Sequence, residues 1–458
     1  MPDEKTDGRD YNVRQWLPWT EIFRSFQIAL DPSKMVLAAA AVFLLWAGWA
    51  ILGALFAPKD STYGVWPGNV ERGPNPVFAL RETSPAEFIR GNFWFGDGRS
   101  VPVQFEPFQK FVGPVLGLIK SNPREGAWYY YLLGLLYTAA LWAVFGGAIS
   151  RMVAVQFARR ERLGMIEALR YAIDRFVPLF LGPLLPLAGV AIISVIMTIV
   201  GFFTFFVPVL EIFASLAWPL ALLGGVAMTF LLIGYIGWPI MYATISVEGT
   251  DAFDAISRCY AYVYQKPWHY LFYLLLAFVY GLVTVFVVVL LGSLTVYLAK
   301  WGVGLLPIYN YWRESDPLST IFVYAPTSYG WRDLLIGDHK LEDLTKDMGW
   351  HQVLAAGIMA FWMHAVFLFL IGFAYSYFWS SQTLIYFLLR KRVDDTDMDE
   401  VFLEESEETL TTTYPPAPSG DAAPPAQPAP SPSVNASTDA KPVEAPAVGT
   451  NTPPPSGN

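Results

Sequence analysis

Six long apolar runs, separated by polar stretches, account for much of the chain. Each run holds about 20 residues or more, the length that an α-helix needs to cross a hydrocarbon core about 30 Å thick. The runs predict six membrane-spanning helices, at about residues 36–56, 127–150, 179–206, 217–244, 270–298 and 354–379. The expected fold class is therefore all-α, a polytopic transmembrane helix bundle.

The stretch Gly249–Pro267 has a different pattern, with apolar and charged residues on opposite faces of a helix. Its apolar stripe recurs at spacings of three and four and consists of Phe253, Ile256, Tyr260 and Val263. On the other face, Asp254 can pair with Arg258, four residues further on. Pro267 ends the stretch and the next span follows at once, so we expect an amphipathic helix at the membrane interface.

Two further stretches repeat this unit of amphipathic helix, proline and span. Shifting back by 87 positions gives the stripe Ile166, Leu169, Ile173 and Phe176, followed by Pro178. The first copy has the stripe Trp19, Ile22, Phe26 and Leu30, followed by Pro32. Amphipathic helices before spans are common in membrane proteins, but the joint recurrence favours an internal repeat of interfacial helix plus span.

Residues 16–393 form the predicted six-span membrane domain. Around and within it lie a flexible N-terminus, two outer excursions, an acidic segment and a disordered Pro/Ala-rich tail, at residues 1–15, 57–126, 299–353, 394–410 and 411–458. The first excursion ends in an amphipathic face that we expect on the outer membrane surface, made of Phe108, Phe111, Val112, Val115 and Ile119. The first excursion has no pattern of a nucleophile beside a base, so we expect a small cap and not a catalytic domain.

The most basic connection follows the second span and includes Arg159, Arg160 and Arg162. Short loops rich in Lys and Arg stay in the cytoplasm. With six spans, this predicts that both termini of a multi-pass protein lie on the cytoplasmic side of the cytoplasmic (inner) membrane. The same arginines, and Arg258, are candidates for contact with anionic lipid headgroups, although a role in topology alone explains the cluster.

The composition supports a membrane protein without a nucleic-acid partner. Hydrophobic residues make up 54% of the chain and charged residues 15%, against about 25% in typical globular domains. The net charge of −9 comes largely from nine acids between Asp394 and Glu408. Cys259 is the single cysteine, which excludes an intrachain disulfide and a Cys-rich metal site. No phosphate-binding loop or catalytic motif occurs, so we predict no cofactor, no metal and no catalytic residue.

Glu211 and His364 are the candidate intramembrane polar residues. His364 lies inside the sixth run, where an ionisable group suggests a proton relay or a ligand contact. The alternative is a neutral imidazole bonded to a neighbouring helix. Glu211 could bind a cation or proton in a carrier, or it could simply meet water and a helix N-terminus in a turn.

The acidic segment has Val401-Phe402-Leu403 at its centre. An apolar triplet flanked by acids is typical of a segment that docks a basic protein partner, whereas a solvated tail explains the acids alone. Membrane lipids are the other expected partners.

Four stretches together carry a resemblance to known proteins: WAVFGGAISRMVAVQFARRERLGMIEALRYA (142–172), GPLLPLAGVAI (182–192), ISVEGTDAFDAISRCYAYVYQKPWHYLFY (245–273) and YFWSSQTLIYFLLRKRVDDTDMDEVFLEE (377–405). They resemble an uncharacterised group of six-span bacterial inner-membrane proteins. The unit of amphipathic helix and span is more remotely similar to the membrane domain of glycerophosphodiester phosphodiesterases. Their catalytic barrel has no counterpart here, so neither resemblance implies an activity.

Three functions remain open. Interfacial helices, the acidic segment and the lack of catalytic motifs favour a non-enzymatic scaffold or assembly partner. Proline around the third span, glycine in the fourth and the repeats would suit a small-molecule or ion carrier or channel. A lipid-acting membrane enzyme would need a polar cluster that the linear pattern hides.

Overall fold

The computed structural model describes residues 17–56, 106–120, 127–206, 218–304 and 349–402, together with a few isolated positions between 206 and 218. Every regular element within these ranges is a helix, which confirms the all-α class. Six of the described helices are long and apolar enough to cross a membrane. The chain is a multi-pass membrane protein.

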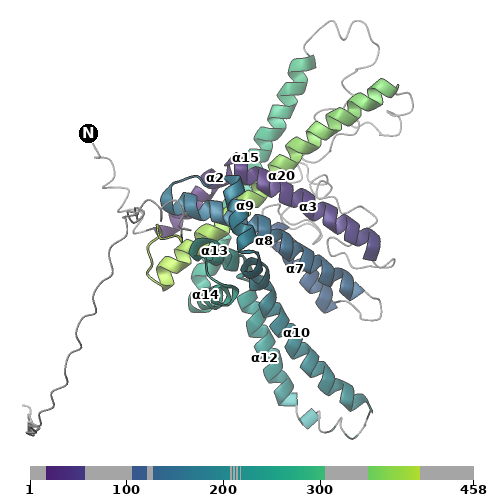
Figure 1. Cartoon of the computed structure of the whole chain (residues 1–458), viewed down its shortest axis with the longest axis vertical. Coiled ribbons are helices and arrows are strands. Elements are labelled where there is room, and N and C mark those ends of the chain that lie inside the picture. Colours follow the sequence, from purple (N-terminus) through teal and green to yellow (C-terminus); the bar gives the residue numbers. More distant parts are fainter. Residues whose placement is uncertain are drawn as a thin grey trace, which may run out of the picture. The chain divides into compact units, whose positions relative to one another are not determined.

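The long helices extend beyond most of the predicted spans (Figure 1). They are α3 (Pro32–Phe56), α8 (Ala127–Arg159), α10 (Phe176–Phe206), α12 (Trp218–Tyr235), α15 (Pro267–Gly304) and α20 (Trp350–Val393). The shorter elements are the 3-10 helix η1 (Pro18–Phe23), α2 (Arg24–Ala29), α7 (Glu106–Lys120), α9 (Met165–Asp174), α13 (Trp238–Glu248) and α14 (Ala252–Gln265). The tail at 411–458 and most of both outer excursions lie outside the described residues.

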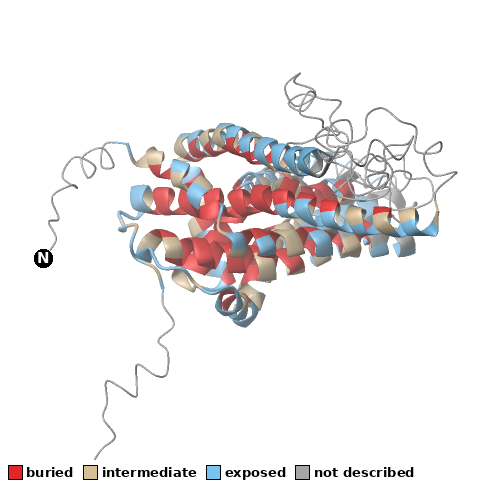
Figure 2. Ribbon diagram, turned by 90° about the horizontal axis from the view of Figure 1, so that it is seen from above, coloured by how far each residue is buried: buried red, intermediate tan, exposed pale blue. Residues whose placement is uncertain are grey.

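The core is built around α13, in which every residue from Trp238 to Val247 is buried. Trp238 lies edge-on to Trp379 of α20, with ring centroids 5.8 Å apart, and Trp379 also contacts Trp142 of α8. Figure 2 shows the buried residues gathered in one part of the bundle, while exposed residues follow the outer lengths of the helices. Aromatic packing between α8, α13 and α20 therefore holds the centre together.

The apolar face of α7 predicted a helix lying on the outer membrane surface, but the structure buries α7 within the bundle. Phe111 is fully buried and stacks on Trp238, with centroids 4.3 Å apart and ring planes 23° apart. The polar residues Glu106 and Lys110 are also buried. A helix that buries both faces belongs to the core, because a surface helix keeps its charged face in water.

The fourth predicted span, 217–244, is not continuous. Its helix ends at Tyr235 and a new one begins at Trp238, with Pro239 in the first turn. Proline has no N–H to donate, so the helical hydrogen-bond ladder is interrupted there. The lack of a side chain on Gly237 also matters, since a Cβ would lie 2.7 Å from Cys259 Sγ of α14. The break lets α14 pack closely on α13.

Helix α14 buries only part of the predicted apolar stripe. Phe253 is 72% exposed, and Ile256 and Tyr260 are only half-buried. The buried residues are Ala252, Ala255, Cys259, Tyr262 and Val263. Val263 is thus the one fully buried member of the stripe, and the small side chains of Ala255 and Cys259 allow the helix backbones to approach.

The same face is buried in the other copies of the repeat. In α9, 87 positions earlier, Ala168 and Ala172 are buried and correspond to Ala255 and Cys259. In α2 the position of Cys259 is taken by Ser25, which is also fully buried. Each of these short helices is followed by a long one, so burial and helix order both support a repeated unit.

Gly249 joins α13 to α14 in a conformation that favours glycine. Its φ is +66°, and a Cβ there would lie 2.6 Å from the Phe402 ring. A left-handed conformation costs a residue with a side chain roughly 1–2 kcal/mol. We therefore expect Gly249→Ala to lower the free energy of unfolding in detergent by at least roughly that amount.

Gly225→Ala is the matched control for this substitution. Gly225 lies within α12, and nothing lies within 4 Å of the position that its Cβ would take. Stability should stay the same or rise slightly, because alanine favours helix more than glycine does. Equal losses in the two variants would contradict the described turn.

Candidate functional site

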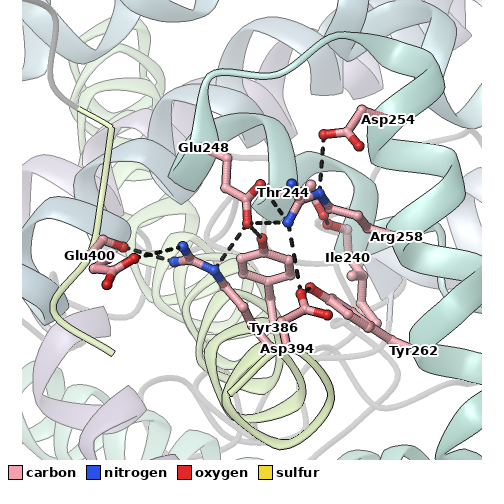
Figure 3. A network of polar contacts seen from close by, with 10 residues as sticks. Ile240, Thr244, Glu248, Asp254, Arg258, Tyr262, Tyr386, Asp394 and Glu400 are labelled. Carbon is pink, nitrogen blue, oxygen red and sulfur yellow. Dashed lines mark hydrogen bonds and ion pairs between the residues drawn. The ribbon is translucent and has the colours of Figure 1, made fainter. Parts of the chain in front are cut away.

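Charged side chains from three helices and the segment after α20 converge where α13 ends (Figure 3). We call this group the Glu248 cluster; its members are Glu248, Asp254, Arg258, Tyr262, Tyr386, Arg390, Asp394 and Glu400. Members far apart in the sequence meet here because α13, α14 and α20 end or begin at the same level of the bundle.

The carboxylate of Glu248 is the centre of the cluster. Its side chain is only 9% exposed, and Oε2 lies 2.9 Å from Arg258 Nη1. On the other side, Oε1 forms an ion pair with Arg390 Nε at 3.0 Å and accepts a hydrogen bond from the Tyr386 hydroxyl. One buried negative charge is thus shared between two guanidinium groups.

Arg258 links this centre to α14 and to the end of α20. Its Nε donates to Asp254 Oδ2 at 3.1 Å, which confirms the predicted pair, and its Nη1 lies 3.8 Å from Asp394 Oδ2. Burial disfavours the charged form of Arg258, but Glu248 and Asp254 outweigh this effect and raise its pKa above the usual value. The guanidinium keeps its positive charge at any physiological pH.

After α20 the chain turns back onto the cluster. We call residues 394–402 the returning segment. Asp394 accepts a hydrogen bond from the Tyr262 hydroxyl, and burial together with this carboxylate raises the pKa of Tyr262. Arg390 Nη1 donates to the Glu400 carbonyl at 2.9 Å. The Phe402 amide then donates to the Val247 carbonyl at 2.8 Å.

The Phe402 ring, in the last residue of the returning segment, packs on the α13–α14 turn. It lies against Gly249, and the Arg175 guanidinium sits 5.5 Å from the ring centroid. Such cation–π contacts contribute on the order of 0.5–1 kcal/mol at exposed sites. Phe402 is still 38% exposed.

Cationic and phenolic groups from α8 and α9 satisfy the last carbonyls of α13. Arg151 Nη1 donates to the Ser246 carbonyl at 2.9 Å, and the Tyr171 hydroxyl donates to the Ile245 carbonyl at 2.7 Å. Arg175 donates to the Gly249 carbonyl. These groups stabilise a helix C-terminus, where free carbonyls carry partial negative charge.

A pocket of about 780 Å³ opens beside the cluster. Its charged lining combines Arg159 and Arg390 with Glu248, Asp399 and Glu400. The pocket is thus lined by both cations and carboxylates, and no group of three metal-ligating side chains occurs among the described residues. The arrangement is suited to holding charged side chains in place.

The structure separates the residues that the sequence had singled out. Arg258 belongs to the Glu248 cluster, and Arg159 lines the pocket beside it. Arg160 and Arg162 are exposed in the connection between α8 and α9. His364 is half-buried on α20, away from the cluster, and Glu211 lies outside the described residues.

Sequence reasoning missed a second polar group, which lies inside the bundle. Glu106 Oε2 accepts hydrogen bonds from Lys110 Nζ at 3.0 Å and from the Tyr375 hydroxyl at 2.8 Å. The three side chains are buried. The indole N–H groups of Trp238 and Trp379, also buried, have no acceptor among the described residues. The sequence pattern indicated an amphipathic helix here, and nothing in it indicated that Glu106 and Lys110 are buried as well.

No protein-family model, no curated protein and no solved structure matches the chain.

The cluster predicts a difference between two acid-to-amide substitutions that both touch Arg258. Glu248→Gln removes the charge between two guanidinium groups, whereas Asp254→Asn affects an i,i+4 pair whose carboxylate is 40% exposed. Breaking a buried pair costs about 3–5 kcal/mol. Because Arg258 is partly exposed, we expect a loss of about 2–3 kcal/mol for Glu248→Gln.

Asp254→Asn should lower stability by only about 0.3–0.5 kcal/mol, the usual size of such helix pairs. Unfolding in detergent, followed by circular dichroism, measures both variants against the unchanged chain. Losses of the same size would show that Glu248 is not the centre of the cluster.

Proposed function

We propose that this protein is a non-enzymatic scaffold of the cytoplasmic membrane, which assembles other membrane proteins along α10 and α12. The observation that carries the proposal is how little the chain covers these two helices. In their most apolar stretches only 22% of α10 and 11% of α12 is buried by the described residues, compared with 61% of α8, 44% of α3, 33% of α15 and 24% of α20. Figure 1 shows α10 and α12 side by side.

Glycine on both helices supports contact with another helix. At Gly201 of α10 and Gly225 of α12, nothing lies within 4 Å of the position that a Cβ would take. Small residues let helix backbones approach closely, and this close packing drives association in a membrane, where burying apolar surface gives little gain. A partner helix could therefore pack against either position.

The Glu248 cluster supports the same function because it holds together the helices against which α10 packs. α10 packs against α8, α13 and α14, and α13 and α14 are joined through Glu248 and Arg258. Each charged group at the centre of the cluster has its counter-charge within the chain. The cluster is therefore suited to holding helices, whereas an active site needs a reactive group that is free to meet a substrate.

The orientation is part of the proposal. Arg159, Arg160 and Arg162 lie at the same end of the bundle as the C-terminal turn of α20, which contains Arg390, Lys391 and Arg392. The concentration of basic residues at this end supports a cytoplasmic location for both termini. We also propose that the acidic segment, Asp394–Glu408, binds a basic protein partner. Within this segment, Phe402 packs on the α13–α14 turn.

Photo-crosslinking in intact membranes tests the scaffold. Leu222 of α12 is 53% exposed, one turn from Gly225. A photoreactive residue at Leu222 should give discrete protein adducts, and Gly225→Leu in the same chain should reduce them by about tenfold, because the added side chain separates the helices. Gly357→Leu is the control, since Gly357 of α20 also has nothing within 4 Å of its Cβ position.

Adducts with lipid alone would contradict the scaffold and favour the second candidate, a carrier. That candidate is supported by Glu106, Lys110 and Tyr375, because buried ionisable groups inside a membrane bundle often mark an ion or proton path. Ion flux in proteoliposomes that disappears with Glu106→Gln would then identify it.

A further inference from the structure

A second pocket, of about 340 Å³, lies between η1, the first turn of α15 and the last turn of α20. Four aromatic rings form most of its wall, those of Trp19, Trp268, Phe272 and Tyr273. Two further side chains, His269 and Arg392, supply polar groups. The pocket therefore combines an apolar wall with a cationic edge.

The charge in this pocket is positive and has no counter-charge within the described chain. Neither Asp nor Glu lines the pocket, and Arg392 has no ion pair among the described residues. This differs from the Glu248 cluster, where Arg390, two residues away, is paired with Glu248 and Glu400.

An exposed apolar face leads from the pocket along α15. Trp268, Phe272, Leu275 and Val279 follow at spacings of three and four, and their exposed fractions are 79%, 46%, 58% and 51%. Since α15 is one of the six helices apolar enough to cross a membrane, this face meets acyl chains below the headgroup level. The pocket at its start then lies at the depth of the headgroups.

We propose that this pocket binds an anionic phospholipid, with its phosphate on Arg392 and His269 and its acyl chains along α15. Arginine matches phosphate oxygens with charge-assisted hydrogen bonds. Tryptophan beside the pocket suits the interface, where its ring meets both the apolar and the wet layer. A free phosphate would use the cations but leave the aromatic wall and the α15 face uncovered. A choline headgroup would suit the rings but would be repelled by Arg392.

Native mass spectrometry of the full chain, purified in detergent, tests this site. Phosphatidylglycerol and phosphatidylcholine with the same acyl chains are added at equal concentrations. We expect retention of phosphatidylglycerol about tenfold above that of phosphatidylcholine, and Arg392→Gln should remove this preference, since one charged contact corresponds to about one order of magnitude in affinity. Trp268→Ala should weaken the retention of both lipids.

Lys391→Gln is the matched control, because Lys391 is an exposed neighbour with the same charge that does not line the pocket. It should keep the preference, and glycerol phosphate without acyl chains should not displace the lipid. Equal losses in the Lys391 and Arg392 variants would show a diffuse surface charge. An unchanged preference in Arg392→Gln, or equal retention of both lipids by the intact chain, would overturn the site. The thermal unfolding of each variant without added lipid shows that it has folded.

Discussion

The carboxylate of Glu248 lies between two guanidinium groups that come from different helices, Arg258 of α14 and Arg390 of α20. A carboxylate in a nearly dry position is costly unless its charge is balanced and its oxygens are hydrogen-bonded. Both conditions are met here because the end of α13, the first half of α14 and the last turns of α20 lie at one level of the bundle. The position of these helices therefore depends on the pairing at Glu248.

Several other features follow from that arrangement. The turn after Glu248 must be tight, so Gly249 takes a positive φ and leaves room for the Phe402 ring. The close contact of α14 with α13 requires the small residues Gly237 and Cys259 at their crossing. Because Arg390 also holds Glu400, the same pairing returns residues 394–402 to the bundle. The charges of the Glu248 cluster are balanced within the chain, and the described chain covers little of α10 and α12. Both features are consistent with a scaffold.

The sequence predicted what depends on local pattern and missed what depends on distant contacts. Long apolar runs were enough for the six spanning helices, and spacing was enough for the pair of Asp254 and Arg258. The burial of α7 was missed, because Glu106 and Lys110 resemble a solvated face until Tyr375, far along the chain, is placed beside them. The role of Glu248 was missed for the same reason, since Arg390 is on another helix. The burial of Ala255 and Cys259 in α14 was not predicted, because larger apolar residues dominate the periodicity, while close packing of helices favours small ones.

Hydrogen exchange at the Phe402 amide tests most directly whether the Glu248 cluster holds the returning segment. This amide donates to the Val247 carbonyl, and the only link from α20 to Glu400 among the described contacts is Arg390. Arg390→Gln should speed exchange at Phe402 by at least about tenfold, the effect of losing roughly 1.4 kcal/mol of local stability, while amides in the middle of α8 keep their protection. Unchanged protection of Phe402 in Arg390→Gln would contradict this role of the Glu248 cluster, because the returning segment would then be held without Arg390.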